Sequence, residues 1–144
     1  MIKQAMVQDF MRATELAMLL WPGHDVDEME ETMKDYIFAD QSAIYLYFEE
    51  TIAVGLAICT LRNDYVEGTH TSPVGYLEGI YVREDYQKQG IARKLLAQCE
   101  KWAKYHGCLE FASDCELDNT DSLAFHLSVG FKEANRVICF MKKL

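Results

Sequence analysis

The sequence has no apolar stretch long enough to cross a bilayer. Its longest apolar run, residues 52–61, falls short of the roughly 20 residues that a membrane-spanning helix needs. The opening residues, MIKQAMVQDF, also lack the apolar segment of a signal peptide. We therefore expect neither secretion nor insertion into a membrane.

Paired cysteines are also missing. The five cysteines are odd in number, and none is spaced as a C-x-x-C pair; they occupy positions 59, 99, 108, 115 and 139. This spacing favours neither a disulfide framework nor a zinc site, so we expect no bound metal. Reduced cysteines in apolar segments are typical of core residues, which predicts a cytoplasmic protein.

Basic residues are few. The chain has 14 Lys and Arg residues against 23 Asp and Glu residues, a net charge of −9. This balance disfavours nucleic acid as a partner and favours a cation. Residues 25–40 alone contain seven acids and one base, Lys34. A run of this kind is more often the solvated face of a helix than a binding site.

Internal repeats and low-complexity linkers are absent, so residues 1–144 are expected to form a single domain. The hydrophobic periods predict these elements in order: an edge strand in 1–7, helices 9–20 and 26–38, strands 43–48 and 52–61, a polar loop 62–74, strand 76–82, a helix from 90, strand 109–114, helix 119–129, and one or two closing strands in 131–141. Asp25 or Asp27 is the predicted cap of the second helix. This order indicates an α/β fold with a mixed sheet.

Residues 76–99 are the most informative stretch of the sequence, because they combine a buried strand, a polar turn and an amphipathic helix. The first amides of a helix lack partners and carry a positive dipole, so such a turn can bind an anion. Gly90 and the small Ala92 leave room for a phosphate, and Lys88, Arg93 and Lys94 make the segment locally basic. The alternative is an ordinary connection with a solvated basic face.

The turn QKQGIA, residues 87–92, resembles the Q/R-x-x-G-x-G/A signature of the GNAT acyltransferases. The resemblance implies acetyl-CoA as co-substrate. It assigns the pyrophosphate to Lys88, Gln89, Gly90, Ile91, Ala92 and Arg93. It places Ile80, Tyr81 and Val82 along the acetyl-pantetheine arm, with the Val82 amide polarising the thioester.

More of the chain is similar to one GNAT branch, the aminoglycoside 6′-N-acetyltransferases. The motifs that carry this similarity extend almost from end to end: Trp21, Tyr65, SPVGYLEGIYV (72–82), EFASD (110–114), LDN (117–119), H-x-x-x-GF (126–131) and VICFMKK. The resemblance implies a GNAT fold with a mostly antiparallel mixed sheet and about four helices, a homodimer, and transfer of acetyl to the 6′-amine of an antibiotic, which confers resistance.

The same resemblance implies residue roles. Asn119 falls at a CoA contact, and the antibiotic contacts are Trp21, Tyr65, Glu78 and Asp114. Asn135 stands where relatives carry a glutamate in this site, although Glu133 is close in sequence. The chemistry agrees, because carboxylates pair with the ammonium groups of a polycation and aromatic rings cover its sugars. Alone, either aromatic reads more simply as a surface or core residue.

The expected reaction is direct attack of the amine on the thioester, with the developing oxyanion held by the Val82 amide. We expect Glu78 to remove the ammonium proton, through a water, and Asp114 to position the substrate. A charge within an apolar strand is costly unless it has a partner or solvent, so Glu78 stands out. His126 occupies the position where GNAT enzymes often place a tyrosine acid, and a packed helical histidine is the alternative.

Two other functions fit these residues. One is a GNAT acetyltransferase that modifies another small amine or a protein amine, since an acidic pocket suits those cations too. The other is a non-catalytic acyl-CoA-binding protein.

Overall fold

The computed structural model describes residues 1–144 as five strands, four α-helices and two short 3-10 helices. Their bounds are β1 (Ile2–Gln4), η1 (Val7–Asp9), α1 (Phe10–Leu20), α2 (Val26–Phe38), β2 (Ser42–Glu49), β3 (Ile52–Arg62), β4 (Val74–Val82), η2 (Glu84–Tyr86), α3 (Ile91–Tyr105), β5 (Phe111–Ser113) and α4 (Thr120–Ser128). The predicted helices and the central hairpin are confirmed, with small shifts at their ends.

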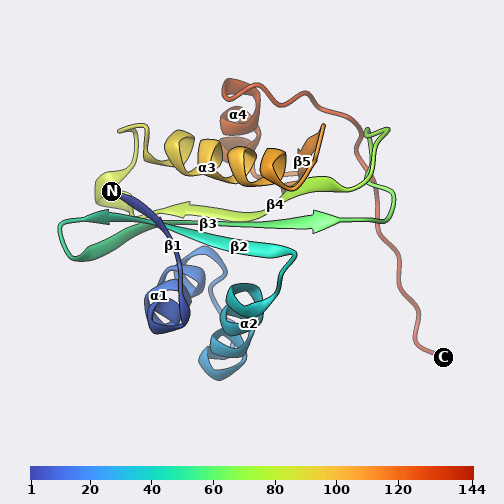
Figure 1. The fold of residues 1–144 in the computed structure, drawn as a ribbon. Helices are drawn as coiled ribbons and strands as arrows, with labels where there is room; N and C mark the ends of the chain where they lie inside the picture. Colours follow the sequence, from blue (N-terminus) through green and yellow to red (C-terminus); the bar gives the residue numbers. More distant parts are fainter.

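The sheet has the order β1-β2-β3-β4-β5. Strands β1 to β4 pair antiparallel, and β5 pairs parallel to β4. Helices α1 and α2 cover one face, whereas α3 and α4 lie on the other (Figure 1). The predicted mixed, mostly antiparallel α/β sheet with four helices is therefore confirmed.

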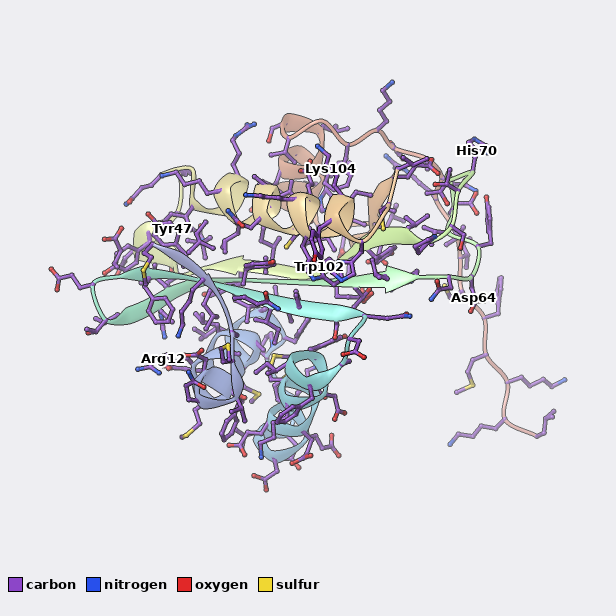
Figure 2. All side chains as sticks on the ribbon, in the orientation of Figure 1. Arg12, Tyr47, Asp64, His70, Trp102 and Lys104 are labelled. Carbon is purple, nitrogen blue, oxygen red and sulfur yellow. The ribbon has the colours of Figure 1, made fainter.

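Each face of the sheet has its own core. Ala13, Leu16 and Met33 of the first two helices pack against the sheet on one side. Leu95 and Trp102 of α3 pack against the other side, and Figure 2 shows the Trp102 side chain between α3 and the sheet. Apolar side chains at helical spacing meet the alternating side chains of the strands, so burial on both faces fixes the layers.

The predicted cap of α2 is confirmed at Asp25. Its carboxylate accepts a hydrogen bond from the main-chain N–H of Asp27 over 3.0 Å. This bond satisfies one of the free amides at the start of the helix, and the acidic first turn suits the positive end of the dipole.

No helix combines the length and the apolar character required to cross a membrane.

Strand β4 contains a bulge at Glu78. Gly79 pairs with Ile58, and Leu77 pairs with the next residue of β3, Cys59, so Glu78 has no partner across the ladder. Strand β5 pairs with β4 only from Gly75 to Leu77. Residues 78–82 therefore have a strand neighbour on one side only, and their other edge is open.

The closing strands predicted within residues 131–141 are absent. Phe131 donates its main-chain N–H to the carbonyl of His126, but residues 132–144 form no main-chain hydrogen bond with any strand. Their apolar pattern suits a strand, but a strand requires a partner, and the chain instead passes the loop between β3 and β4 and leads away from the sheet (Figure 1). We call residues 136–144 the tail.

The prediction that all cysteines lie in the core holds for three of the five. Cys59, Cys99 and Cys108 are buried, whereas Cys115 and Cys139 are exposed. Cys115 follows the short strand β5, and Cys139 lies in the tail, where nothing packs over it. None of the five forms a disulfide.

Candidate active site

The turn between β4 and α3 leaves the start of α3 open. Lys88 has a φ of 62° and Gly90 a φ of 80°, so the chain twice enters the left-handed region before the helix begins. No side chain caps the helix, and a Cβ placed on Gly90 would meet no atom within 4 Å. Free amides, a positive dipole end and open space satisfy the requirements of a phosphate site.

The predicted cradle residues do not all point to this space. Lys88, Gln89 and Gly90 are exposed, but the Ile91 side chain is buried in the core beneath α3. Arg93 donates from Nη2 to the carbonyl oxygen of Ser128 over 3.2 Å, which ties α3 to α4. Ile91 can therefore serve a ligand only through its main chain.

The open edge of β4 leads from the bulge to this turn. Around it, Ile80 packs towards α3 and Tyr81 towards the α1 and α2 side. The Gln87 amide donates to the Val82 carbonyl over 2.9 Å, and the Arg83 N–H donates to Val54 over 2.8 Å. These side chains and bonds fix the main chain of β4, whose free edge is available to an extended ligand.

Glu78, at the bulge of β4, forms an ion pair with Arg62 that was not predicted from the sequence. Its carboxylate accepts bonds from Arg62, at 3.1 Å from Nε and 2.6 Å from Nη2 to Oε1, and Thr60 donates to the same oxygen over 3.2 Å. The Glu78 side chain is 18% exposed. The cost of a charge in an apolar strand is thus offset by a bidentate ion pair with access to solvent.

Asp114 lies beside this ion pair. The Tyr76 hydroxyl donates to the Asp114 carboxylate, and the Arg62 guanidinium lies 3.4 Å from the centre of the Tyr76 ring. Burial and then the Asp114 carboxylate raise the pKa of Tyr76, so the phenol keeps its proton. On α2, burial and then the charge of Glu78 raise the pKa of Tyr36.

Trp21 lies against the same stretch of β4. A Cβ added to Gly79 would be 2.8 Å from two atoms of the Trp21 ring. The indole therefore packs directly on the strand one residue from Glu78. The structure brings together Trp21, Glu78 and Asp114, which the sequence placed in one acceptor site.

Tyr65 and Asn135 belong to a different neighbourhood. Tyr65 is exposed in the loop between β3 and β4, without a hydrogen bond. Asn135 donates to the Glu67 carboxylate of that loop over 2.9 Å, whereas Glu133 pairs with Arg136. The segment before the tail, which includes Asn135, therefore contacts the loop between β3 and β4. We call these two segments the outer wall; they carry the exposed Tyr65 and the carboxylate of Glu67.

His126 is held by both ring nitrogens. Nδ1 lies 2.7 Å from the Ser122 carbonyl and Nε2 lies 2.8 Å from the Ser113 hydroxyl. The ring also packs on Phe131. This geometry joins α4 to β5 and fits the packing alternative, although Ser113 could pass a proton to or from Nε2. Asn119 caps α4 by accepting from the Ser122 N–H over 3.0 Å.

Sequence reasoning missed Arg62, Thr60 and Tyr76. Thr60 and Arg62 both lie at the C-terminal end of β3, where polar residues indicate the end of a strand, and Tyr76 fits the core alternation. Only the register that pairs Thr60 with Tyr76 brings these residues to Glu78. No group of three or more His, Cys, Asp or Glu side chains is arranged to hold a metal ion.

Comparisons with known proteins agree with this arrangement. Residues 8–131 match the model of the acetyltransferase (GNAT) family. An aminoglycoside N(6′)-acetyltransferase type 1 from Acinetobacter genomosp. 13 is 46% identical over 130 residues, covering 90% of this chain and 88% of the relative. One of the same name from Stenotrophomonas maltophilia is 38% identical, covering 99% of this chain and 93% of the relative.

A solved structure extends the similarity to three dimensions. AAC(6′)-Iy in complex with the bisubstrate analogue CoA-S-monomethyl-acetylneamine is 35% identical, with a TM-score of 0.96, and the match covers 100% of this chain and 98% of that one. That protein binds a molecule in which CoA and an aminoglycoside fragment are joined. The similarity covers both the open turn and the residues around Glu78.

Proposed function

This chain belongs to the GNAT acetyltransferase family, and we propose that it transfers the acetyl group of acetyl-CoA to the 6′-amine of aminoglycoside antibiotics. The observation that carries the proposal is the placement of two carboxylates at β4. Glu78 lies on this strand, and Asp114 bonds to its Tyr76, while the open edge of the same strand leads to the free start of α3. One strand thereby joins an anion site to a cation site.

The phosphates of acetyl-CoA would bind at the start of α3. Residues 88–90 are exposed and Gly90 borders open space, so main-chain N–H groups of residues 89–92 and the Lys88 side chain would bind the phosphates there. The pantetheine arm would lie along the free edge of β4 near Ile80, Tyr81 and Val82. The main chain of Val82 would then be close to the thioester carbonyl, where an N–H donor stabilises negative charge.

The acceptor would bind with its ammonium groups at Glu78 and Asp114. Trp21 would cover one sugar ring from below, and Tyr65 and Asn135 would contact the antibiotic from the outer wall. Because Asn135 is neutral and holds Glu67, the negative charge on that wall comes from Glu67. Polycations fit such a site better than single amines, because each carboxylate can pair with a different ammonium group.

The chemical step is direct transfer. The ammonium, with an ordinary pKa of about 10.4 by analogy with lysine, first gives its proton to Glu78 through a water. The amine nitrogen then bonds to the acetyl carbon, the bond from carbon to sulfur breaks, and the thiolate leaves while the nitrogen gives its second proton to solvent. His126 would supply the proton for that thiolate, with Ser113 as the connecting hydroxyl.

Thiol release from acetyl-CoA tests the proposal. The protein should release CoA thiol rapidly with kanamycin or tobramycin and slowly with spermidine. Release with spermidine alone would identify an acetyltransferase of another amine, and binding of acetyl-CoA without release would identify a non-catalytic binding protein. Expression of the active protein should also raise the tolerance of bacteria to kanamycin.

We also propose that the protein is a homodimer in which the tail contacts the second copy. Val137, Ile138, Phe140 and Met141 of the tail are 71–90% exposed. The tail has no main-chain partner, and β5 forms an open edge of the sheet. When two copies exchange tails, the tail of each can form main-chain hydrogen bonds with the unpaired sheet edge of the other and bury its apolar side chains there.

Sedimentation of matched variants tests this assembly. Phe140→Asp in the tail should give monomers. Phe38→Asp is the control, because Phe38 is a comparably exposed phenylalanine outside the tail, at the end of α2. Dimers of the Phe140 variant, or monomers of the wild-type protein, would contradict the proposal.

The five unpaired cysteines support a cytoplasmic location, where thiols stay reduced. The net charge of −9 supports a small cationic partner over nucleic acid or an anionic membrane. Fractionation of cells that express the chain tests the location.

A further inference from the structure

Arg62 lies where a cationic substrate would bind. Its Nε and Nη2 donate to Glu78 Oε1 over 3.1 Å and 2.6 Å, and Nη2 also lies 3.1 Å from Oε2. With Thr60 on the same carboxylate, most acceptor directions of Glu78 are used. An incoming ammonium therefore meets a carboxylate that already has a cation.

The same guanidinium also uses the aromatic face of the pocket. Its Cζ lies 3.4 Å from the centre of the Tyr76 ring, whose hydroxyl donates to Asp114. Partial burial lowers the pKa of Arg62, but the hydrogen bonds and charge of Glu78, and more weakly Tyr76 and Asp114, outweigh it, so the pKa is raised. Arg62 thus makes the contacts that suit a bound alkylammonium: a carboxylate, an aromatic face and a second acid nearby.

Arg62 has few contacts to hold it at Glu78. Its side chain is 42% exposed, and all of its side-chain hydrogen bonds go to Glu78. Arg83, just after β4, differs because it donates to the Ala53 carbonyl over 3.1 Å and pairs with Glu15 over 3.0 Å. A guanidinium held by one carboxylate and one aromatic face can turn into solvent when a competitor takes both contacts.

We propose that Arg62 is the resident counter-ion of Glu78 in the acceptor site, and that a cationic acceptor must displace it to bind there. This inference rests on the proposed function. Displacement costs every acceptor the same ion pair, and a polycation recovers the cost through a second contact at Asp114. A monoamine has only the contact with Glu78, so the same cost leaves it with little net binding; the discrimination itself comes from Asp114.

Steady-state kinetics with Arg62→Gln test the inference. The KM for tobramycin should fall about fivefold, equivalent to about 1 kcal/mol, and the KM for a simple monoamine should fall by a similar factor. The KM for acetyl-CoA should stay unchanged. A purely structural role for Arg62 would weaken acceptor binding instead, so the direction of the change decides.

Arg12→Gln is the matched control, because it removes the same charge from an ion pair, with Asp9, outside the residues assigned to the site. Arg62→Lys keeps the charge but loses the bidentate contact, so its KM for tobramycin should lie between those of wild type and Arg62→Gln. If Arg62→Gln does not fold, the KM of Arg62→Lys for tobramycin tests the inference by itself.

An unchanged or raised KM for tobramycin in the Arg62 variants, or an equal fall in Arg12→Gln, would overturn the inference. Failure of the wild-type protein to acetylate any aminoglycoside would instead overturn the proposed function.

Discussion

Trp21 and Gly79 are in direct contact across the boundary between α1 and the sheet. The position of a Cβ on Gly79 lies 2.8 Å from the Trp21 ring and 2.9 Å from Leu20. Only glycine permits this approach, and it occurs next to the β4 bulge that presents Glu78. The packing of Trp21 on β4 and the irregularity in the strand therefore lie at the same place.

Gly79→Ala should push the indole away from β4. We expect a loss of about 1–3 kcal/mol in the free energy of unfolding, as for other overpacked sites, and a raised KM for aminoglycosides. In a Trp21→Ala background, the same substitution should cost less, because much of the clash has been removed. Equal costs in both backgrounds, measured by denaturant unfolding, would show that the two residues do not interact.

Glu78→Gln should lower kcat strongly while acetyl-CoA affinity stays nearly unchanged. The amide can still accept bonds from Thr60 and Arg62, but it cannot take the substrate proton, and loss of a general base costs about 100-fold or more. Glu31→Gln, in an exposed ion pair with Lys34 on α2, is the control. Unchanged turnover in the Glu78 variant would remove this residue from the mechanism.

Gly90→Ala should weaken acetyl-CoA binding. A φ of 80° costs an alanine about 1 kcal/mol, and the new methyl group would enter the open space at the start of α3. Gly107→Ala is a matched control, because Gly107 has a φ of 85°, equally open surroundings and a place just beyond the other end of α3. Calorimetry should show weaker acetyl-CoA binding only for the Gly90 variant, although both lose similar stability.

Asp9→Asn should destabilise the fold by about 2 kcal/mol at neutral pH. Burial raises the pKa of Asp9, but the N–H of Met6 and the charges of Lys3 and Arg12 outweigh it, so the folded-state pKa lies below the ordinary 3.8. Because the folded pKa is depressed, the stabilisation is present above 3.8 and is lost as the pH falls through the folded value.

The difference in unfolding free energy between wild type and Asp9→Asn should therefore be constant from pH 7 to about pH 5 and shrink in more acidic solution. A difference that grows with acidity would contradict this assignment.

The sequence predicted elements whose pattern is local. The apolar period and the Asp25 cap set α2, and the change of period at Gly90 set the start of α3. Both depend on residues within a few positions of each other, so no knowledge of the tertiary fold was needed.

The same reasoning could not predict features that depend on pairing between distant segments. Arg62 meets Glu78 only because β3 and β4 pair in one register with a bulge. The pattern of residues 131–141 predicted one or two strands, which is wrong, because no pattern shows whether a partner strand is within reach. The roles of Trp21, Tyr65, His126 and Asn135 in catalysis or binding stay predictions.

The central claim is that acetyl passes to a 6′-amine, and the position of the acetyl group tests it most directly. The enzyme should be given acetyl-CoA and a matched pair of aminoglycosides that differ only in bearing an amine or a hydroxyl at the 6′ carbon. NMR spectra of the products should place one acetyl group on the 6′ nitrogen of the first compound and show no reaction with the second. Acetylation of both compounds at another amine, or of neither, would contradict the account.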